Sequence, residues 1–64
     1  SAGGQRVTVR MIIQNTGIVS RATISNSTLQ DPAVERCVLF WVRAIRFPKF
    51  DGAPLDERVN FLFQ

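Results

Sequence analysis

The chain has no histidine and a single cysteine, Cys37, among its 64 residues. Without histidine it cannot build a zinc site from His and Cys ligands. A Ser-His-Asp triad and a Cys-His nucleophile pair are excluded for the same reason. The lone Cys37 cannot form a disulfide within the chain. It is either a buried apolar thiol or one half of a bridge to a cysteine outside this fragment. No apolar run approaches the 18 residues of a membrane-spanning helix.

What remains is the composition of one small, mildly basic domain. Hydrophobic residues make up 45% of the chain, charged residues 20%, and the net charge is +3. A chain of this size buries only about 60% of its unfolded surface, so its stability is marginal. The positive charge fits a solvated surface, or attraction to nucleic acid or an anionic envelope polymer. We expect residues 1–5 to be a disordered lead-in or a cloning scar, and residues 6–64 to form the domain.

The first third of the chain predicts a β-hairpin. Apolar residues alternate with polar ones over positions 6–13, which is typical of a half-buried strand. Its expected core face consists of Val7, Val9, Met11 and Ile13. The loop 15–17 fits a three-residue turn in which Gly17 has positive φ. A bulge near Ser20 and Arg21 then restores the apolar phase of a second strand over about 18–25.

A helix is predicted from Asp31 to Pro48. Asp31 is a favourable N-cap residue, Pro32 suits the first helical position, and Pro48 ends the helix. One apolar stripe at helical spacing is expected to pack on the sheet. It consists of Val34, Cys37, Val38, Trp41, Ala44 and Ile45.

The last segment predicts a third strand after a loop over residues 49–56. Its expected core face is Val59, Phe61 and Phe63. A helix between the second and third strands makes these two parallel, so they are not neighbours if the first strand lies between them. The fold class is therefore α+β. The elements run β-β-α-β, and the antiparallel sheet has the order 2-1-3 with one helix on one face.

These segments resemble the TonB C-terminal domain superfamily, and most closely its AgmX/PglI C-terminal variety. The resemblance is carried by V-T-V-R-x-x-I at residues 7–13 and G-I-V-S-R-A-T-I-S-N-S at 17–27. The helix D-P-A-V-E-R-C-V at 31–38, the R-F-P at 46–48 and the final V-N-F-L-F at 59–63 add to it. The helix motif is the most specific of them. The likeness covers residues 6–63, nearly the whole chain.

The resemblance implies a non-enzymatic periplasmic docking domain, without cofactor, metal or catalytic residues. Its parent would be anchored in the inner membrane through a segment not present here. It would couple an inner-membrane motor to outer-membrane or envelope partners in gliding motility or TonB-dependent transport. The partner would add an extended segment to the last strand by β-strand addition. The binding residues would be Arg58, Val59, Asn60, Phe61 and Leu62.

The resemblance also bears on Cys37. Family members usually have a further helix before the first strand, often with a cysteine, and this chain has neither. A cysteine in the parent would allow Cys37 to form a disulfide, as suits an oxidising periplasm.

Three apolar residues lie off the expected core stripe. They are Leu39, Phe40 and Val42. The loop at residues 49–56 or a missing N-terminal helix would cover them. The alternative is a hydrophobic contact patch for a homodimer or another partner.

Two further classes of function are weaker alternatives. A basic sheet face with Arg6, Arg10 and Arg21 would suit a nucleic-acid-binding domain, but it has no aromatic residues on which bases could stack, so nucleic acid is not expected as a partner. The acids Asp56 and Glu57 have no recognisable nucleophile or pocket beside them, so an enzyme is not expected. A purely structural dimerisation module is the remaining alternative.

Overall fold

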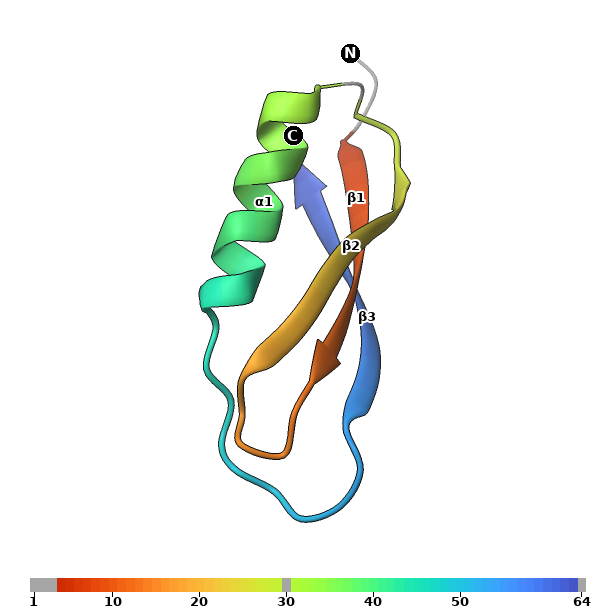
Figure 1. Cartoon of the computed structure of the whole chain (residues 1–64). Coiled ribbons are helices and arrows are strands. Elements are labelled where there is room, and N and C mark those ends of the chain that lie inside the picture. Colours follow the sequence, from red (N-terminus) through yellow and green to blue (C-terminus); the bar gives the residue numbers. More distant parts are fainter. Residues whose placement is uncertain (1–3, 30, 64) are drawn as a thin grey trace.

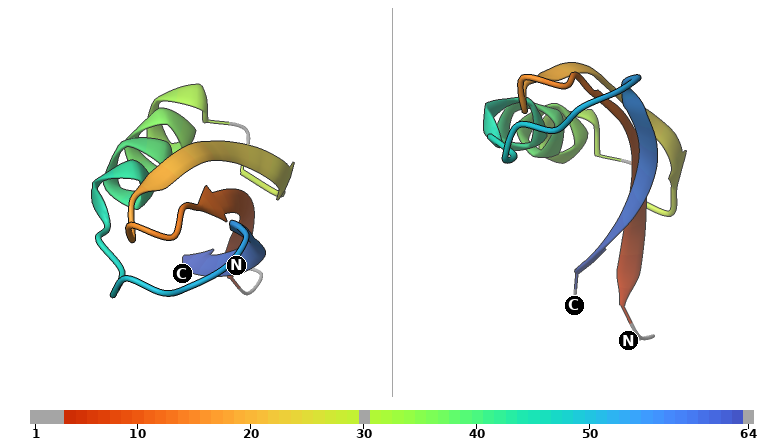
Figure 2. Two further views of the ribbon diagram at one scale, coloured as in Figure 1. Left: turned by 60° about the horizontal axis from the view of Figure 1, so that its bottom comes forward. Right: turned by 90° about the horizontal axis from the view of Figure 1, so that it is seen from below.

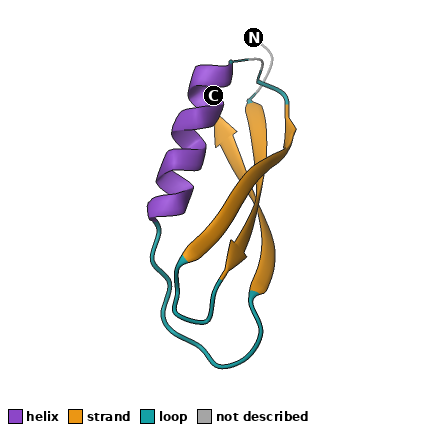
Figure 3. Ribbon diagram, viewed as in Figure 1, coloured by secondary structure: helices purple, strands orange, loops and turns teal. Residues whose placement is uncertain are grey.

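The computed structural model describes residues 4–29 and 31–63, and it confirms the predicted α+β architecture. The elements are β1 (Gln5–Ile13), β2 (Val19–Ser27), α1 (Pro32–Ala44) and β3 (Leu55–Phe63). The strands form one antiparallel sheet in the order β2-β1-β3, and α1 packs on one face (Figures 1 and 3). Gln5 belongs to β1, so the expected lead-in is one residue too long. Residues 1–3 lie outside the described part.

The β1–β2 hairpin has the predicted turn and the predicted bulge. Gly17 has φ +91°, and the amide of Gln14 donates to the carbonyl of Ile18 over 2.8 Å. Ile12 pairs with Arg21 while Ile13 pairs with Val19, which leaves Ser20 as the extra residue. A second irregularity, between Thr8 and Val9, was not predicted. β2 itself runs over Val19–Ser27, so it begins one residue later and ends two residues later than predicted.

The core lies between α1 and the β1–β2 half of the sheet. All four predicted core residues of β1 are buried. The buried side chains are Val7, Val9, Met11, Ile13, Val19, Ala22 and Val42. The helix lies over β2 and touches β1, but no Cα atom of α1 comes within 8 Å of one in β3. The helix therefore covers only part of the sheet face.

The side of α1 that was predicted to face the sheet is wrong by part of a helical turn. Val42, assigned to an outer patch, is 1% exposed and is the fully buried residue of the helix. Leu39 is half-buried and packs on the core. Trp41, by contrast, is 65% exposed although it was assigned to the core stripe. Cys37, Ala44 and Ile45 are exposed as well. The residues facing the sheet are Val38, Leu39 and Val42.

The start of α1 was predicted correctly and its end was not. The Asp31 carboxylate accepts from the amides of Ala33 and Val34 at 3.1 and 3.4 Å, as expected of an N-cap. The helix ends at Ala44, before Pro48, because Ile45 is extended with ψ 140°. Residues 45–50 form a strap, by which we mean the extended segment that crosses the β1–β2 turn.

The sheet curls, and its far end is open. Figure 2 shows the curve running from β2, beside the helix, through β1 to β3. The radius of gyration is 12.9 Å, against about 11 Å for a compact chain of this length. β3 begins at Leu55, inside the predicted loop. Its Phe61 and Phe63 are half-buried, but Val59, an expected core residue, is 38% exposed.

Candidate functional site: a free sheet edge beside an apolar groove

The edge of β2 is covered along its first half by the strap and the end of α1. Ile18 forms an isolated antiparallel bridge with Arg46, and the amide of Phe47 donates to the carbonyl of Gly17 over 2.9 Å. Further along, the Arg43 guanidinium donates to the carbonyl of Ala22 over 3.2 Å. The strap therefore blocks the approach to the start of β2, and the Ala22 carbonyl within β2 is already engaged.

The hydrogen bonds of β1 show which way its main chain faces. In Arg6 both the amide and the carbonyl bond to Thr28, on the β2 side. The carbonyls of Thr8 and Ile12 accept from serine hydroxyls of β2. In a strand, the N–H and C=O of successive residues point to opposite sides. The even-numbered residues of β1 therefore bond to β2, and the odd-numbered residues bond to β3.

The same alternation identifies the free groups of β3. Val9 pairs with Val59 and Val7 with Phe61, so odd-numbered β3 residues bond to β1. The even-numbered residues then direct their N–H and C=O groups away from the sheet. They are Asp56, Arg58, Asn60 and Leu62. Among residues 4–29 and 31–63 no segment pairs with this side of β3. It is a row of unused donors and acceptors.

The helix-facing side of this edge is an apolar groove. It lies between α1 and the end of β3 and has a volume of about 480 Å³. Its lining residues are Val34, Cys37, Val38, Trp41, Val42, Ile45, Phe61 and Phe63. Trp41 is the most exposed large side chain among them. The groove exists because the helix packs on β2 and leaves the aromatic residues of β3 without a full partner.

The opposite, convex side of the edge is polar and basic. Arg10 Nε donates to Asp56 Oδ1 over 2.9 Å, and Thr8 Oγ1 donates to Asn60 Oδ1 over 2.6 Å. The Arg10 hydrogen bond is the main reason why the pKa of Asp56 lies below its ordinary value. Desolvation of the Asp56 carboxyl raises its pKa and opposes this shift, and the positive charges of Arg10 and Arg58 lower the pKa further. Within the described residues, no acid lies within 4 Å of a charged nitrogen of Arg58.

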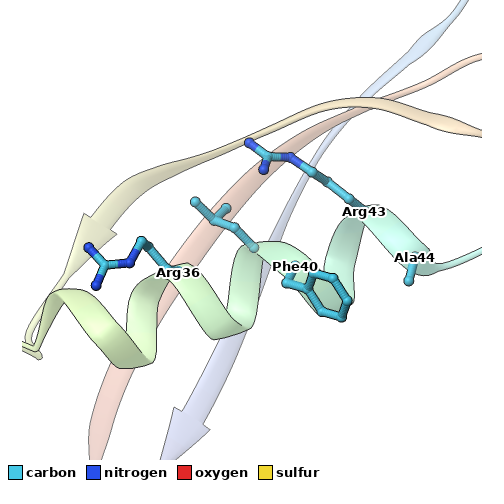
Figure 4. Close-up of a pocket in the computed structure, with 5 residues that line it drawn as sticks. Arg36, Phe40, Arg43 and Ala44 are labelled. Atoms are coloured by element: carbon cyan, nitrogen blue, oxygen red, sulfur yellow. The ribbon is translucent and has the colours of Figure 1, made fainter.

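A second surface depression lies along α1, on the flank that is next to β2. It has a volume of about 560 Å³ and is lined by Arg36, Leu39, Phe40, Arg43 and Ala44. Figure 4 shows Arg36 and Arg43 extending from one side of the helix and Phe40 from the other. Arg43 is engaged with Ala22, as described above. This depression is lined by residues of α1 alone, so it offers no strand edge.

The predicted strand site is a continuous edge, whereas the predicted hydrophobic patch is not a single surface. Residues 58–62 form the central and final part of β3. In the patch, only Phe40 is strongly exposed, at 65%, since Val42 is buried and Leu39 half-buried. Cys37 is an exposed free thiol, which contradicts a buried core position. No sequence pattern predicts the groove, because all of its helix residues except Val42 belong to the expected core stripe.

Comparisons with protein-family models, curated proteins and solved structures find no match to this chain. In the described part of the chain, no helix has the length and apolar character needed to cross a membrane. The functional argument therefore depends on the geometry of the edge and the groove.

Proposed function

We propose that this chain is a non-enzymatic docking domain that binds an extended segment of a partner protein by β-strand addition to β3. The single observation behind the proposal is the difference between the two sheet edges. The strap and Arg43 engage the edge of β2, whereas the even-numbered residues of β3 direct their main-chain groups outward. An added strand satisfies such groups, and its alternate side chains provide selectivity.

The resemblance to the TonB C-terminal domain gives this proposal a setting. The parent would be a periplasmic protein anchored in the inner membrane, and its partner an outer-membrane or envelope protein. The process would be gliding motility or TonB-dependent transport, with force supplied by a motor complex elsewhere. Cell fractionation of the tagged parent tests this setting separately from strand addition. A parent found wholly in the cytoplasm would contradict the setting.

Strand addition can be tested with a peptide that carries no partner-specific sequence. The probe is a capped nine-residue peptide in which Val alternates with Thr, a composition that favours extended structure. We expect it to shift the amide signals of residues 56–62 in an NMR titration. N-methylation of all peptide amides should abolish the shifts, because it removes the donors on both edges of the peptide. Shifts confined to α1 would refute the proposal.

A matched pair of variants tests the same edge from the side of the protein. Arg58→Pro removes one outward-facing amide, a position where an edge strand tolerates proline. Arg58→Ala removes the side chain and keeps that amide. We expect both variants to fold and only Arg58→Pro to lose the peptide. Equal binding by the two variants would show that the edge is not the docking site.

A further inference from the structure

We infer that the segment bound by β3 is an amphipathic strand, with apolar side chains facing α1 and acidic side chains facing away. This inference rests on the proposed strand addition and adds the chemistry of the partner. It is drawn from two unlike surfaces that flank the free edge. The apolar groove lies on one side, and on the other lie Arg6 and Arg58, which have no ion-pair partner among the described residues.

The groove defines the inner side of the incoming strand. Because the sheet curls, a strand added beyond β3 continues the curve beside the open side of the helix (Figure 2). Its inward side chains would lie next to Phe61 and Phe63 and approach Trp41. The groove volume of about 480 Å³ lies within the range of about 300–1,000 Å³ that is usual for ligand sites. Its lining offers almost no polar group, so apolar side chains are favoured there.

The convex surface defines the outer side of the incoming strand. Arg58 lies directly opposite Arg10 in the register, and Asp56 is already bonded to Arg10. Arg6 lies opposite Leu62, and no acid of the described residues is within 4 Å of its guanidinium. The edge therefore has two cations without an acidic partner. An acidic side chain on the outer side of the added strand would complement them, and a lysine there would be repelled.

Trp41 provides a direct readout, because it is the only tryptophan of the chain and lines the groove. The probes are three capped nine-residue peptides in which Val alternates with Asp, Val with Lys, or Ser with Asp. We expect the Val/Asp peptide to bind best and to shift the Trp41 emission to shorter wavelength. The Val/Lys peptide should bind at least about 3-fold more weakly. The Ser/Asp peptide should bind about 30-fold more weakly, since no apolar side chain enters the groove.

Two pairs of variants separate the two surfaces. Trp41→Ala should weaken the Val/Asp peptide about 10-fold, whereas Phe40→Ala should change its binding less than about 2-fold. Phe40 has the same 65% exposure and does not line the groove. Its ring packs edge-on against Trp41 with centroids 5.7 Å apart, so this control also measures whether the loss of that contact disturbs the groove. Arg58→Glu should reverse the preference between the Val/Asp and Val/Lys peptides, and Arg58→Gln should abolish it.

The outcomes separate this inference from the proposed function. If the three peptides shift the β3 amides with equal affinity and Trp41 emission does not change, strand addition stands and the amphipathic partner is wrong. If no peptide shifts the β3 amides, both are contradicted. If Arg58→Glu still prefers the Val/Asp peptide, the claim that acidic side chains face Arg58 on the outer side of the added strand is wrong.

Discussion

The two edges of this sheet differ although each belongs to a nine-residue strand. The first half of the β2 edge is covered by the end of α1 and by the strap, which bonds to the β1–β2 turn at Gly17 and Asn15. The β3 edge has no such cover in the described residues. Its side chains include Val59 and Leu62, which are 38% and 73% exposed. Proteins normally protect such edges, because an open edge invites pairing with other chains. In the described residues, this domain therefore covers the first half of the β2 edge and leaves the β3 edge available.

The same asymmetry applies to the helix. The side of α1 that faces β2 contributes Val42 to the core, and the side that faces β3 leaves Trp41 exposed. A helix centred on the sheet would have covered both halves equally. Its displacement towards β2 creates the groove and leaves the aromatic residues of β3 half-buried. Edge and groove thus have one structural cause.

The largest expected effect comes from breaking the cover of the β2 edge. A Cβ added at Gly17 would lie 1.9 Å from the carbonyl oxygen of Phe47, and φ there is +91°. We expect Gly17→Ala to lower the free energy of unfolding by about 3 kcal/mol, because the strap must move away from the turn. Urea denaturation measures the change.

Gly52 provides the matched control for this variant. It also has positive φ, at +108°, but a Cβ there meets nothing within 4 Å. Gly52→Ala should therefore cost only the backbone strain, about 1 kcal/mol. Equal losses in the two variants would show that the strap does not press on the turn.

A smaller effect separates the two sides of the helix. Val42→Ala removes buried methyl groups and should cost about 2 kcal/mol. Trp41→Ala should cost less than about 0.5 kcal/mol, although it removes a much larger side chain, because Trp41 is mostly exposed. Thermal unfolding of both variants measures the difference. If the order is reversed, the helix is turned as the sequence stripe had predicted.

The smallest effect concerns the ion pair beside the open edge. The pKa of Asp56 is lower in the folded state than in the unfolded state. The ion pair with Arg10 therefore stabilises the fold fully above the unfolded pKa of about 4. This stabilisation is lost as the pH falls through the folded pKa. Both side chains are about half exposed, so the gain is small. We expect Asp56→Asn to have a lower Tm than the unsubstituted chain at pH 7. Near pH 2 the two Tm values should be equal. A constant Tm difference across this range would contradict the pairing.

The local signals of the sequence predicted much of the fold. Alternation located the core face of β1, Gly17 and the bulge at Ser20 located the hairpin, and Asp31 located the helix start. Each of these is decided by residues close together in the chain. The strand order followed from chain connectivity.

The sequence could not decide which side of α1 faces the sheet. Apolar residues lie on nearly every side of this helix, so the stripe through Trp41 and the one through Val42 were both available. The choice depends on how far the helix lies towards β2, where the strap and Arg43 contact the β1–β2 hairpin. The resemblance predicted residues 58–62 as the binding edge. The cover over the first half of the β2 edge and the groove beside β3 depend on contacts between segments that are distant in the chain. Local sequence patterns do not predict such contacts.

Hydrogen exchange of the β3 amides tests the central claim most directly. In the free protein we expect fast exchange at Arg58, Asn60 and Leu62, and slow exchange at Val59 and Phe61, which bond to β1. The Val/Asp peptide should slow the first set and leave the second set unchanged. Slow exchange at the even-numbered residues of the free protein, or no added protection with the peptide, would contradict an open edge that accepts a strand.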